Sequence, residues 1–519
     1  MKSIKLILSL MICASVLSGC KAESSLNKTY SDAVSILLSD NEIKVDDVVC
    51  DYDTSKAVYI ANDIIYYEEN KDFTYGEGSE KDAHSQDEAD KHIVVHINEA
   101  GTYKLSGKLS YGQIAIDLGK EAKGDKNAVV NLVLDGIDIN CDVAPAIIFY
   151  NVYECGNTDE TKATKDVDTS KAGANVIICD DSVNIVNGSY VAKIYKSDSV
   201  VLSSDKTKVE DAKKLHKYDG AFYSKMSMNI YGEKKNTGIL NINAKNEGLD
   251  SELHLTINGG NININSGNDG INTNEDNISV TTINGGSVNI IVNGETGEGD
   301  GIDSNGWLVI NGGSVSAQAC AFSGDAGIDS DKGIHINGGN VIASGSMLDR
   351  IEDGGQNYVV FNFNGKLAEN TELSFKNTSN KEVMNYKIKN SCSIIVYSSP
   401  DLKEGNYTLW NSDKQLGHYG NNMFFGGMNK AGGNFKPDDN MTLPDGTKPQ
   451  NRPDDFKPDK KPEDFDPSQM PDQFDPNQPA PIRPDGQGKP NQGQLGNMTD
   501  EINTTFEIKK GGNMFNGIS

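Results

Sequence analysis

The sequence predicts an all-β protein, built as a solenoid of stacked strands with about 26 residues per turn. Three observations lead to this fold class. The tetrapeptide I-N-G-G recurs at a near-constant spacing, and short alternations of apolar and polar residues flank each copy. Proline, which cannot donate a hydrogen bond to a sheet, is almost confined to one late stretch: 13 of the 15 prolines lie between Pro437 and Pro490.

Each I-N-G-G copy is expected to be a tight turn between two strands. The copies begin at Ile257, Ile283, Ile310 and Ile336, at intervals of 26, 27 and 26 residues. Apolar alternation precedes and follows each copy, whereas helical spacing is absent. In a stack of such repeats the isoleucines would form an inward ladder, and the asparagines that follow them a polar ladder at a corner.

Composition divides the chain into six segments. Residues 1–20 contain two lysines, an apolar run and L-S-G-C, a pattern that resembles a lipoprotein signal peptide with Cys20 as the lipid acceptor. The stretch at 427–498 is rich in Pro, Asp and Gln, and such a composition cannot bury a hydrophobic core. We predict a signal peptide at 1–20, a linker and cap at 21–92, the solenoid at 93–346, a β cap at 347–426, a disordered segment at 427–498 and a C-terminal strand returning to the body at 499–519.

The net charge and the predicted export signal limit the kinds of partner that we expect for the protein. A lipid on Cys20 would anchor the protein at the extracellular face of the cell membrane, because no later stretch is apolar enough to span a bilayer. The chain has 75 acidic and 48 basic residues, giving a net charge of -27. Such a surface does not attract nucleic acid or anionic lipid. The acids suit either a cation ligand or a soluble exported surface.

An acidic turn recurs in the solenoid and is the first candidate site. Glycines at 248, 270, 301 and 327 are each followed two places on by Asp250, Asn272, Asp303 or Asp329. Stacked carboxylates repel one another unless a cation bridges them, and calcium prefers clustered carboxylates. The alternative is a solvated turn that is rich in Asp and Gly. The predicted calcium ligands are Asp269, Asp300, Asp303, Asp325, Asp329 and Asp331.

Three residues near these turns are candidates for contact with a sugar. Trp307 alternates with Leu308 and Ile310, so if those two point inward Trp307 points outward and offers a flat ring beside the acidic corner. Tyr223 is a second aromatic candidate, and Lys332 is a cationic one.

Residues 93–346 resemble a known family. With G-T-Y-K-L-S-G, S-K-M-S-M-N-I-Y-G and the repeated D-G-I-D and I-N-G-G motifs, they are similar to the bacterial carbohydrate-binding domain family of right-handed parallel β-helix proteins of the cellulose- and pectin-binding clostridial type. The ending T-T-F-E-I-K-K-G-G-N-M-F-N-G-I-S is also similar to that of the family.

The resemblance implies a right-handed parallel β-helix, related in fold to pectate lyases, with bound calcium. It also implies non-catalytic binding of acidic plant polysaccharide such as polygalacturonate (pectin), and of cellulose. The calcium role is carried onto Asp300, Asp303, Asp325 and Asp329, which match the repeated motif. Asn272 and Ala326 replace acids of that pattern and interrupt the ladder.

Two other functions stay open at this point. A calcium-dependent pectate lyase would need a base, for which Lys225, Lys332 and Arg350 are the candidates. A structural surface adhesin would use calcium only to make its solenoid rigid.

Overall fold

The computed structural model describes residues 30, 32–419 and 502–519. These residues form an all-β body whose few helical turns are α1 (Gln86–Ala89) and the 3-10 helices η1 (Lys120–Gly124), η2 (Glu160–Lys162) and η3 (Ser197–Ser199). No helix in this part of the chain is long and apolar enough to cross a membrane. Cys20 and segment 427–498 lie outside the described residues.

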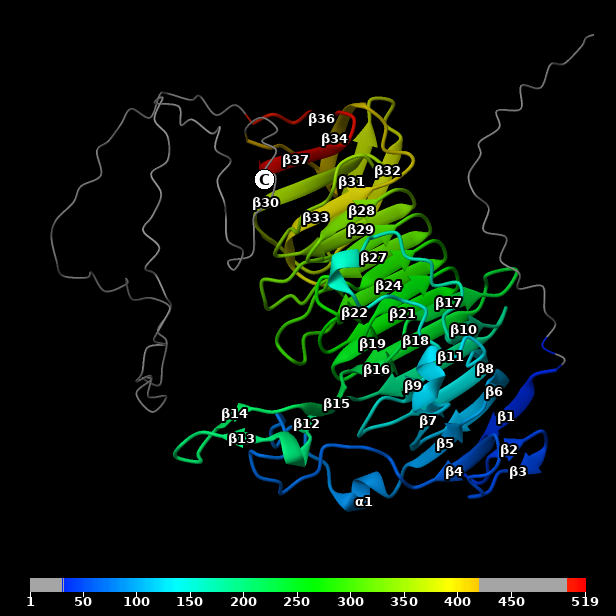
Figure 1. Ribbon diagram of the computed structural model, residues 1–519. Coiled ribbons are helices and arrows are strands. Elements are labelled where there is room, and N and C mark those ends of the chain that lie inside the picture. The colour runs from blue at the N-terminus through cyan, green and yellow to red at the C-terminus, as the bar shows by residue number, and fades with distance from the viewer. Residues whose placement is uncertain (1–29, 31, 420–501) are drawn as a thin grey trace, which may run out of the picture. The chain divides into compact units, whose positions relative to one another are not determined.

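Parallel strands stack into three ladders (Figure 1). The first contains β1 (Val34–Leu38), β6 (Gly101–Leu109), β8 (Val130–Asn140), β10 (Ala174–Ile178), β17 (Met228–Gly232), β20 (His254–Ile257), β23 (Val280–Ile283), β26 (Trp307–Ile310) and β28 (Gly333–Ile336). The second continues from β8 through β11 (Val183–Gly188), β18 (Ile239–Ala244), β21 (Asn261–Ser266), β24 (Ser287–Val292), β27 (Ser314–Gln318) and β29 (Asn340–Gly345).

The third ladder carries the acidic turns. It contains β5 (Ile93–Ile97), β7 (Gly112–Asp117), β9 (Ile147–Asn151), β16 (Gly220–Ser224), β19 (Glu247–Ser251), β22 (Ile271–Thr273) and β25 (Ile302–Ser304), with β4 (Val58–Ala61) antiparallel at its start. Successive strands of the chain belong to the third, first and second ladders in turn. We call each such set of three, for example β22, β23 and β24, a rung.

The I-N-G-G motif forms the corner between the first and second ladders, as predicted. Its isoleucines pair in register and are at most 1% exposed. Its asparagines form a ladder of side-chain hydrogen bonds: Asn284 donates to Asn258 (2.9 Å), Asn311 to Asn284 (2.9 Å) and Asn337 to Asn311 (2.8 Å). Both predicted ladders of this corner are therefore confirmed.

The second glycine of the motif is required by backbone geometry. Gly286 and Gly313 both have a φ of +80°, a region that favours glycine. A Cβ on Gly313 would also lie 2.7 Å from the carbonyl oxygen of Gly286 in the preceding rung. Rungs can stack this closely because the glycine position of the corner carries no side chain.

Apolar side chains fill the space between the ladders. One buried cluster runs from Ile36 in β1 to Val360 and Val396 beyond the last rung. Every second residue of the second ladder points into it, so Ile262 and Val288 are at most 1% exposed while their neighbours face solvent. This alternation is the period of two that the sequence shows.

Beyond the last rung, three strands extend the sheet of the first two ladders, and a separate antiparallel sheet follows. β33 (Cys392–Ser398) pairs with β29 and with β30 (Tyr358–Leu367), and the C-terminal β37 (Gly512–Ile518) pairs in parallel with β30. The second sheet packs aromatic side chains against the first, with Phe361, Phe375 and Phe506 at its centre. It contains β31 (Glu372–Asn377), β32 (Glu382–Lys387), β34 (Gly405–Asn411), β35 (Lys414–Leu416) and β36 (Phe506–Ile508).

Short strands also leave the ladders at two places. Near the start, β2 (Lys44–Val45) and β3 (Val48–Val49) form a small hairpin beside β1. Between β11 and β16 an arm projects, made of β12 (Val191–Tyr195), β13 (Val201–Leu202), β14 (Val209–Asp211) and β15 (Lys214–Tyr218). The arm interrupts the repeat, and no pattern in the sequence predicts it.

Candidate metal centre

The acidic turns stack into one column along the third ladder. Asp250 pairs in register with Asn272, and Asn272 with Asp303. An isolated parallel bridge between Ile302 and Ile328 places Asp329 in the next position. Residues from turns 22 or more residues apart in the sequence are therefore neighbours in space.

A glycine lies two residues before each of these positions and lets the backbones of neighbouring rungs approach each other closely. A Cβ on Gly270 would lie 2.6 Å from the carbonyl oxygen of Gly301, and one on Gly301 would lie 2.3 Å from that of Gly327. Both contacts are too short for any side chain. The G-I-D and G-I-N turns thus owe their glycines to close stacking, and stacking is what brings the acids together.

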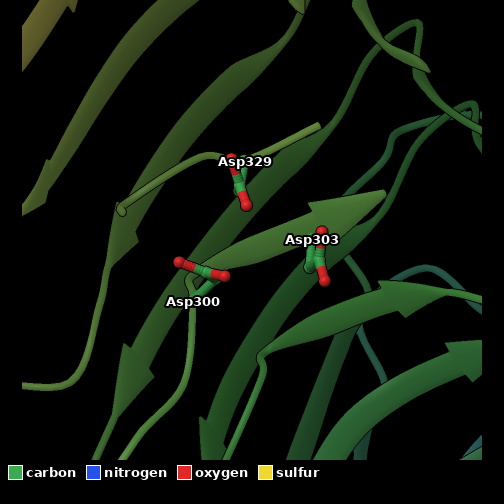
Figure 2. A group of neighbouring side chains, drawn as sticks. All are labelled: Asp300, Asp303 and Asp329. Atoms are coloured by element: carbon green, nitrogen blue, oxygen red, sulfur yellow. The ribbon is translucent and has the colours of Figure 1, made fainter. Parts of the chain in front are cut away.

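Three predicted ligands come close together in the C-terminal part of the column, and Figure 2 shows their side chains. Asp300, Asp303 and Asp329 each offer a carboxylate oxygen, and these three oxygens all lie within 4.8 Å of one another. Asp329 is only 3% exposed, and the other two are half-buried. Hard cations such as calcium take six to eight oxygen ligands at sites of this kind.

The acids also hold the backbone of the neighbouring rung. The N–H of Asp300 donates to Asp269 Oδ1 (2.6 Å), and the N–H of Ala326 donates to Asp300 Oδ1 (2.6 Å). Asp325 accepts from the N–H of Gly299 (2.6 Å) and from the Ser323 hydroxyl. Asp269 and Asp325 are therefore fixed beside the group of three without belonging to it.

Burial and mutual repulsion make these carboxyls hard to ionise. Burial, followed by the charges of Asp269 and Asp329, raises the pKa of Asp300 to about 9. Burial and the charge of Glu247 raise the pKa of Asp269 well above its usual range. Each raised pKa means that the surroundings do not offset the negative charge of the ionised carboxylate. A bound cation would offset it.

A second acidic group lies lower in the same column. Glu247 is 6% exposed and Asp250 is fully buried. Asn272 Nδ2 donates to Glu247 Oε1 (3.0 Å), and Asn274 Nδ2 donates to Asp250 Oδ1 (2.8 Å). Glu247 Oε2, Asp250 Oδ2 and Asn272 Oδ1 are buried and have no hydrogen-bond partner among the described residues.

These buried oxygens without a donor indicate whether the column could hold a cation. A buried acceptor without a donor costs free energy, more so when it is charged. Burial and the charge of Asp219 raise the pKa of Glu247 to about 8, and burial with the charge of Glu247 raises that of Asp250 further above its usual range. Three buried acceptor oxygens without a donor of their own are the type of ligand that a hard cation takes, so these oxygens could supply part of a calcium coordination shell.

Sequence reasoning missed part of this centre. Glu247 and Asp250 follow the repeated motif but were not among the predicted ligands, because the repeat gives no sign of how deeply they are buried. Asp349 lies outside the repeat altogether: it accepts the N–H of Ser330 (3.1 Å), and burial with the charge of Asp329 raises its pKa to about 6. Only the parallel spacing of the acids could have pointed to Glu247 and Asp250.

The other predicted site residues, which are Asp331, Trp307, Lys332 and Tyr223, differ in their exposure. Asp331 is exposed, and Trp307 and Lys332 are half-buried. Tyr223 is 2% exposed and donates to Glu252 Oε1 (2.6 Å), with Tyr218 of the arm packed against its ring at 5.2 Å. The prediction that Tyr223 contacts a ligand directly is therefore wrong, since the arm covers it.

The bases considered for lyase chemistry differ in their surroundings. Lys225 is exposed. Arg350 forms an ion pair with Glu352 (2.6 Å) and donates to the carbonyl oxygen of Lys332 (2.8 Å). The Arg350 guanidinium is therefore engaged with its own neighbours.

In its sequence the chain resembles a family of known proteins. No curated protein matches the chain. A solved structure of a polysaccharide lyase-like protein from C. thermocellum, a gadolinium derivative, is similar at 18% identity with a TM-score of 0.32, over 59% of this chain and 92% of that one. The model of a protein family matches residues 91–155 and 155–353, which together span just over half of the chain. The chain belongs to the family of carbohydrate-binding domain-containing proteins.

Proposed function

We propose that this protein is a non-catalytic, calcium-dependent polysaccharide-binding protein of the cell surface. One observation carries the proposal: three carboxylates from two successive rungs, those of Asp300 and Asp303 in one and Asp329 in the next, have oxygens within 4.8 Å of one another. Membership of a carbohydrate-binding family supports a polysaccharide as the ligand. The proposal joins these two facts, with the cation as the link between protein and sugar.

The favoured ligand is an acidic polysaccharide such as polygalacturonate. A chain with a net charge of -27 repels a polyuronate when no cation is present. Calcium supplies positive charge and takes six to eight oxygens, so three protein carboxylates leave positions for oxygens of the polymer. Asp300 and Asp303 are half-buried, which suits ligands that face both the protein and the solvent.

Trp307 is the proposed sugar platform, with Lys332 as a second contact. Trp307 begins β26, three residues after β25 ends at Ser304, and Ser304 Oγ donates to its carbonyl oxygen (2.9 Å). The two inward neighbours, Leu308 and Ile310, are fully buried while Trp307 keeps part of its surface in solvent. An amphipathic ring at this position suits stacking on a sugar face.

The finer architecture and the location belong to the same proposal. The recurrence of the three strands of each rung supports a parallel β-helix with the three ladders as its faces, and the usual hand of connections between parallel strands makes it right-handed. The L-S-G-C sequence supports lipidation of Cys20 and a place on the extracellular face of the cell membrane.

Binding without cleavage is favoured over lyase activity. A lyase needs a base that takes a proton from the sugar, and the Arg350 guanidinium is held in its ion pair with Glu352. Lys225 directly follows β16, which β19 and β22 separate from β25 in the third ladder.

Retention on immobilised polygalacturonate separates the three candidate functions. The proposal predicts that the full chain is retained in calcium, is released by a chelator, and produces no absorbance of unsaturated uronides on long incubation. Accumulation of that absorbance would replace the binder by a lyase. Lack of retention, with calcium raising only the melting temperature, would replace it by a structural adhesin.

A further inference from the structure

The second ladder presents a flat polar face to solvent. Its strands place Leu240, Ile242 and their equivalents inward, so the alternate residues point outward. Two outward columns follow from the register. One contains Ile185, Asn241, Asn263 and Asn289, and the other contains Asn187, Asn243, Asn265 and Ile291. We call the two columns together the asparagine face; it lies on β11, β18, β21 and β24 (Figure 1).

Hydrogen bonds between rungs hold these side chains in place. Asn263 donates to Asn241 (2.9 Å) and Asn289 donates to Asn263 (3.1 Å) in one column. Asn243 donates to Asn187 (2.8 Å) in the other. An amide carries two hydrogens and an oxygen with two lone pairs, so such a ladder leaves further donors and acceptors for a ligand. The side chains are ordered before any ligand arrives, which lowers the entropy lost on binding.

An open groove runs between the two columns. Its lining consists of isoleucines and asparagines alone: Ile185, Asn241, Ile242, Asn243, Asn263, Ile264, Asn265, Asn289 and Ile291. Asn243 and Asn265 are exposed, and Ile291 keeps 36% of its surface in solvent. In a chain with a net charge of -27, a groove without a charged residue is a distinct surface.

We propose that the asparagine face is a second binding surface, for an uncharged and extended polysaccharide, and that it acts without calcium. This inference rests on the proposed function, since it takes the ligand to be a polysaccharide. It assigns a different class of polymer to a different face: acidic polymer at the carboxylate column, neutral polymer at the amides.

The chemistry of the groove selects this ligand. Amides both donate to and accept from hydroxyl groups, whereas a uronate carboxylate would find no cation here. Ile185 and Ile291 offer aliphatic surface to the C–H faces of sugar rings. The rungs repeat at roughly 4.8 Å along the groove, so a polymer with a regular repeat can make the same contacts at successive rungs.

Retention on insoluble cellulose in excess chelator tests the inference. The full chain should be retained, because neither the polymer nor the face needs calcium. Replacing both Asn243→Ala and Asn265→Ala removes two exposed amides and should weaken binding about tenfold, the effect of one or two lost hydrogen bonds. The matched control replaces Asn284→Ala and Asn311→Ala, two exposed amides of the corner ladder outside the groove, and should bind like the unaltered chain.

Each other outcome overturns the inference. Failure of the unaltered chain to bind cellulose in chelator would do so, as would equal losses in both double variants at unchanged melting temperature. If the Asn243→Ala and Asn265→Ala changes instead alter sedimentation, the face is a contact between copies of the chain. Failure of the proposed function is distinguishable, because it would appear as lost calcium-dependent retention on polygalacturonate.

Discussion

Asp269 Oδ1 accepts the backbone N–H of Asp300 at 2.6 Å, so a carboxylate of one rung fixes the backbone that presents the next carboxylate. Asp300 does the same for Ala326. The acids of the column therefore have two roles, as caps of backbone donors and as candidate ligands. The first role needs only an acceptor oxygen, whereas the second needs a charge, and substitution by asparagine separates the two.

Asp300→Asn should make the calcium-free protein more stable and weaken its response to calcium. The variant keeps an oxygen for the N–H of Ala326 and removes a carboxyl whose pKa burial raises to about 9. At pH 7.5 in chelator we expect the free energy of unfolding to rise by about 2 kcal/mol, allowing for partial exposure. Urea unfolding with and without calcium measures both effects; a less stable variant in chelator would contradict this account.

Without calcium, stability should fall as the pH rises from about 5 to 8. The folded pKa values of Asp300 (about 9) and Asp349 (about 6) exceed the unfolded value of about 3.9. The folded state therefore binds more protons than the unfolded state in this window, and the free energy of unfolding decreases with pH. Urea midpoints across the window, measured in chelator, provide the test.

Calcium should reverse this trend, because only the ionised carboxylates bind it, and proton release should accompany binding. Asp331→Asn is the matched control for the pH series, since Asp331 is exposed and lies outside the group of three. A pH dependence that is the same with and without calcium would argue against the carboxylates as ligands.

Gly313→Ala should destabilise the protein far more than Gly297→Ala. Both glycines have positive φ, +80° and +94°, so both variants carry backbone strain of about 1 kcal/mol. Only at Gly313 would the new Cβ also lie 2.7 Å from the carbonyl oxygen of Gly286, whereas nothing lies within 4 Å at Gly297. Melting temperatures of the two variants compare the effects, and equal losses would show that the close rung stacking is not needed.

Much of the fold could be predicted because each rung repeats the same local chemistry. The spacing of I-N-G-G predicts the buried isoleucines and the asparagine ladder, since a constant period places equivalent residues one above another. The same period brings Asp303 and Asp329 together. Sequence reasoning succeeded wherever contact follows from that period alone.

Contacts made by parts outside the repeat could not be predicted. The arm between β11 and β16 brings Tyr218 against Tyr223, and so buries a ring that alternation alone places near the acidic turns. Its last residue, Asp219, accepts the N–H of Glu247 through its carbonyl oxygen (3.2 Å), at the edge of the buried carboxylates. Asp349 joins the column from beyond the last repeat. Such contacts depend on where an insertion folds back, and no local pattern reports it.

In the proposed function, calcium held by the acidic column joins the protein to an acidic polysaccharide. The most direct measurement is retention on polygalacturonate as a function of calcium concentration, for the unaltered chain, Asp303→Asn and the exposed control Asp331→Asn. We predict that Asp303→Asn needs at least about tenfold more calcium for half-maximal retention, the effect of losing one charged ligand, and that Asp331→Asn matches the unaltered chain. Equal calcium dependence of all three proteins would contradict the claim.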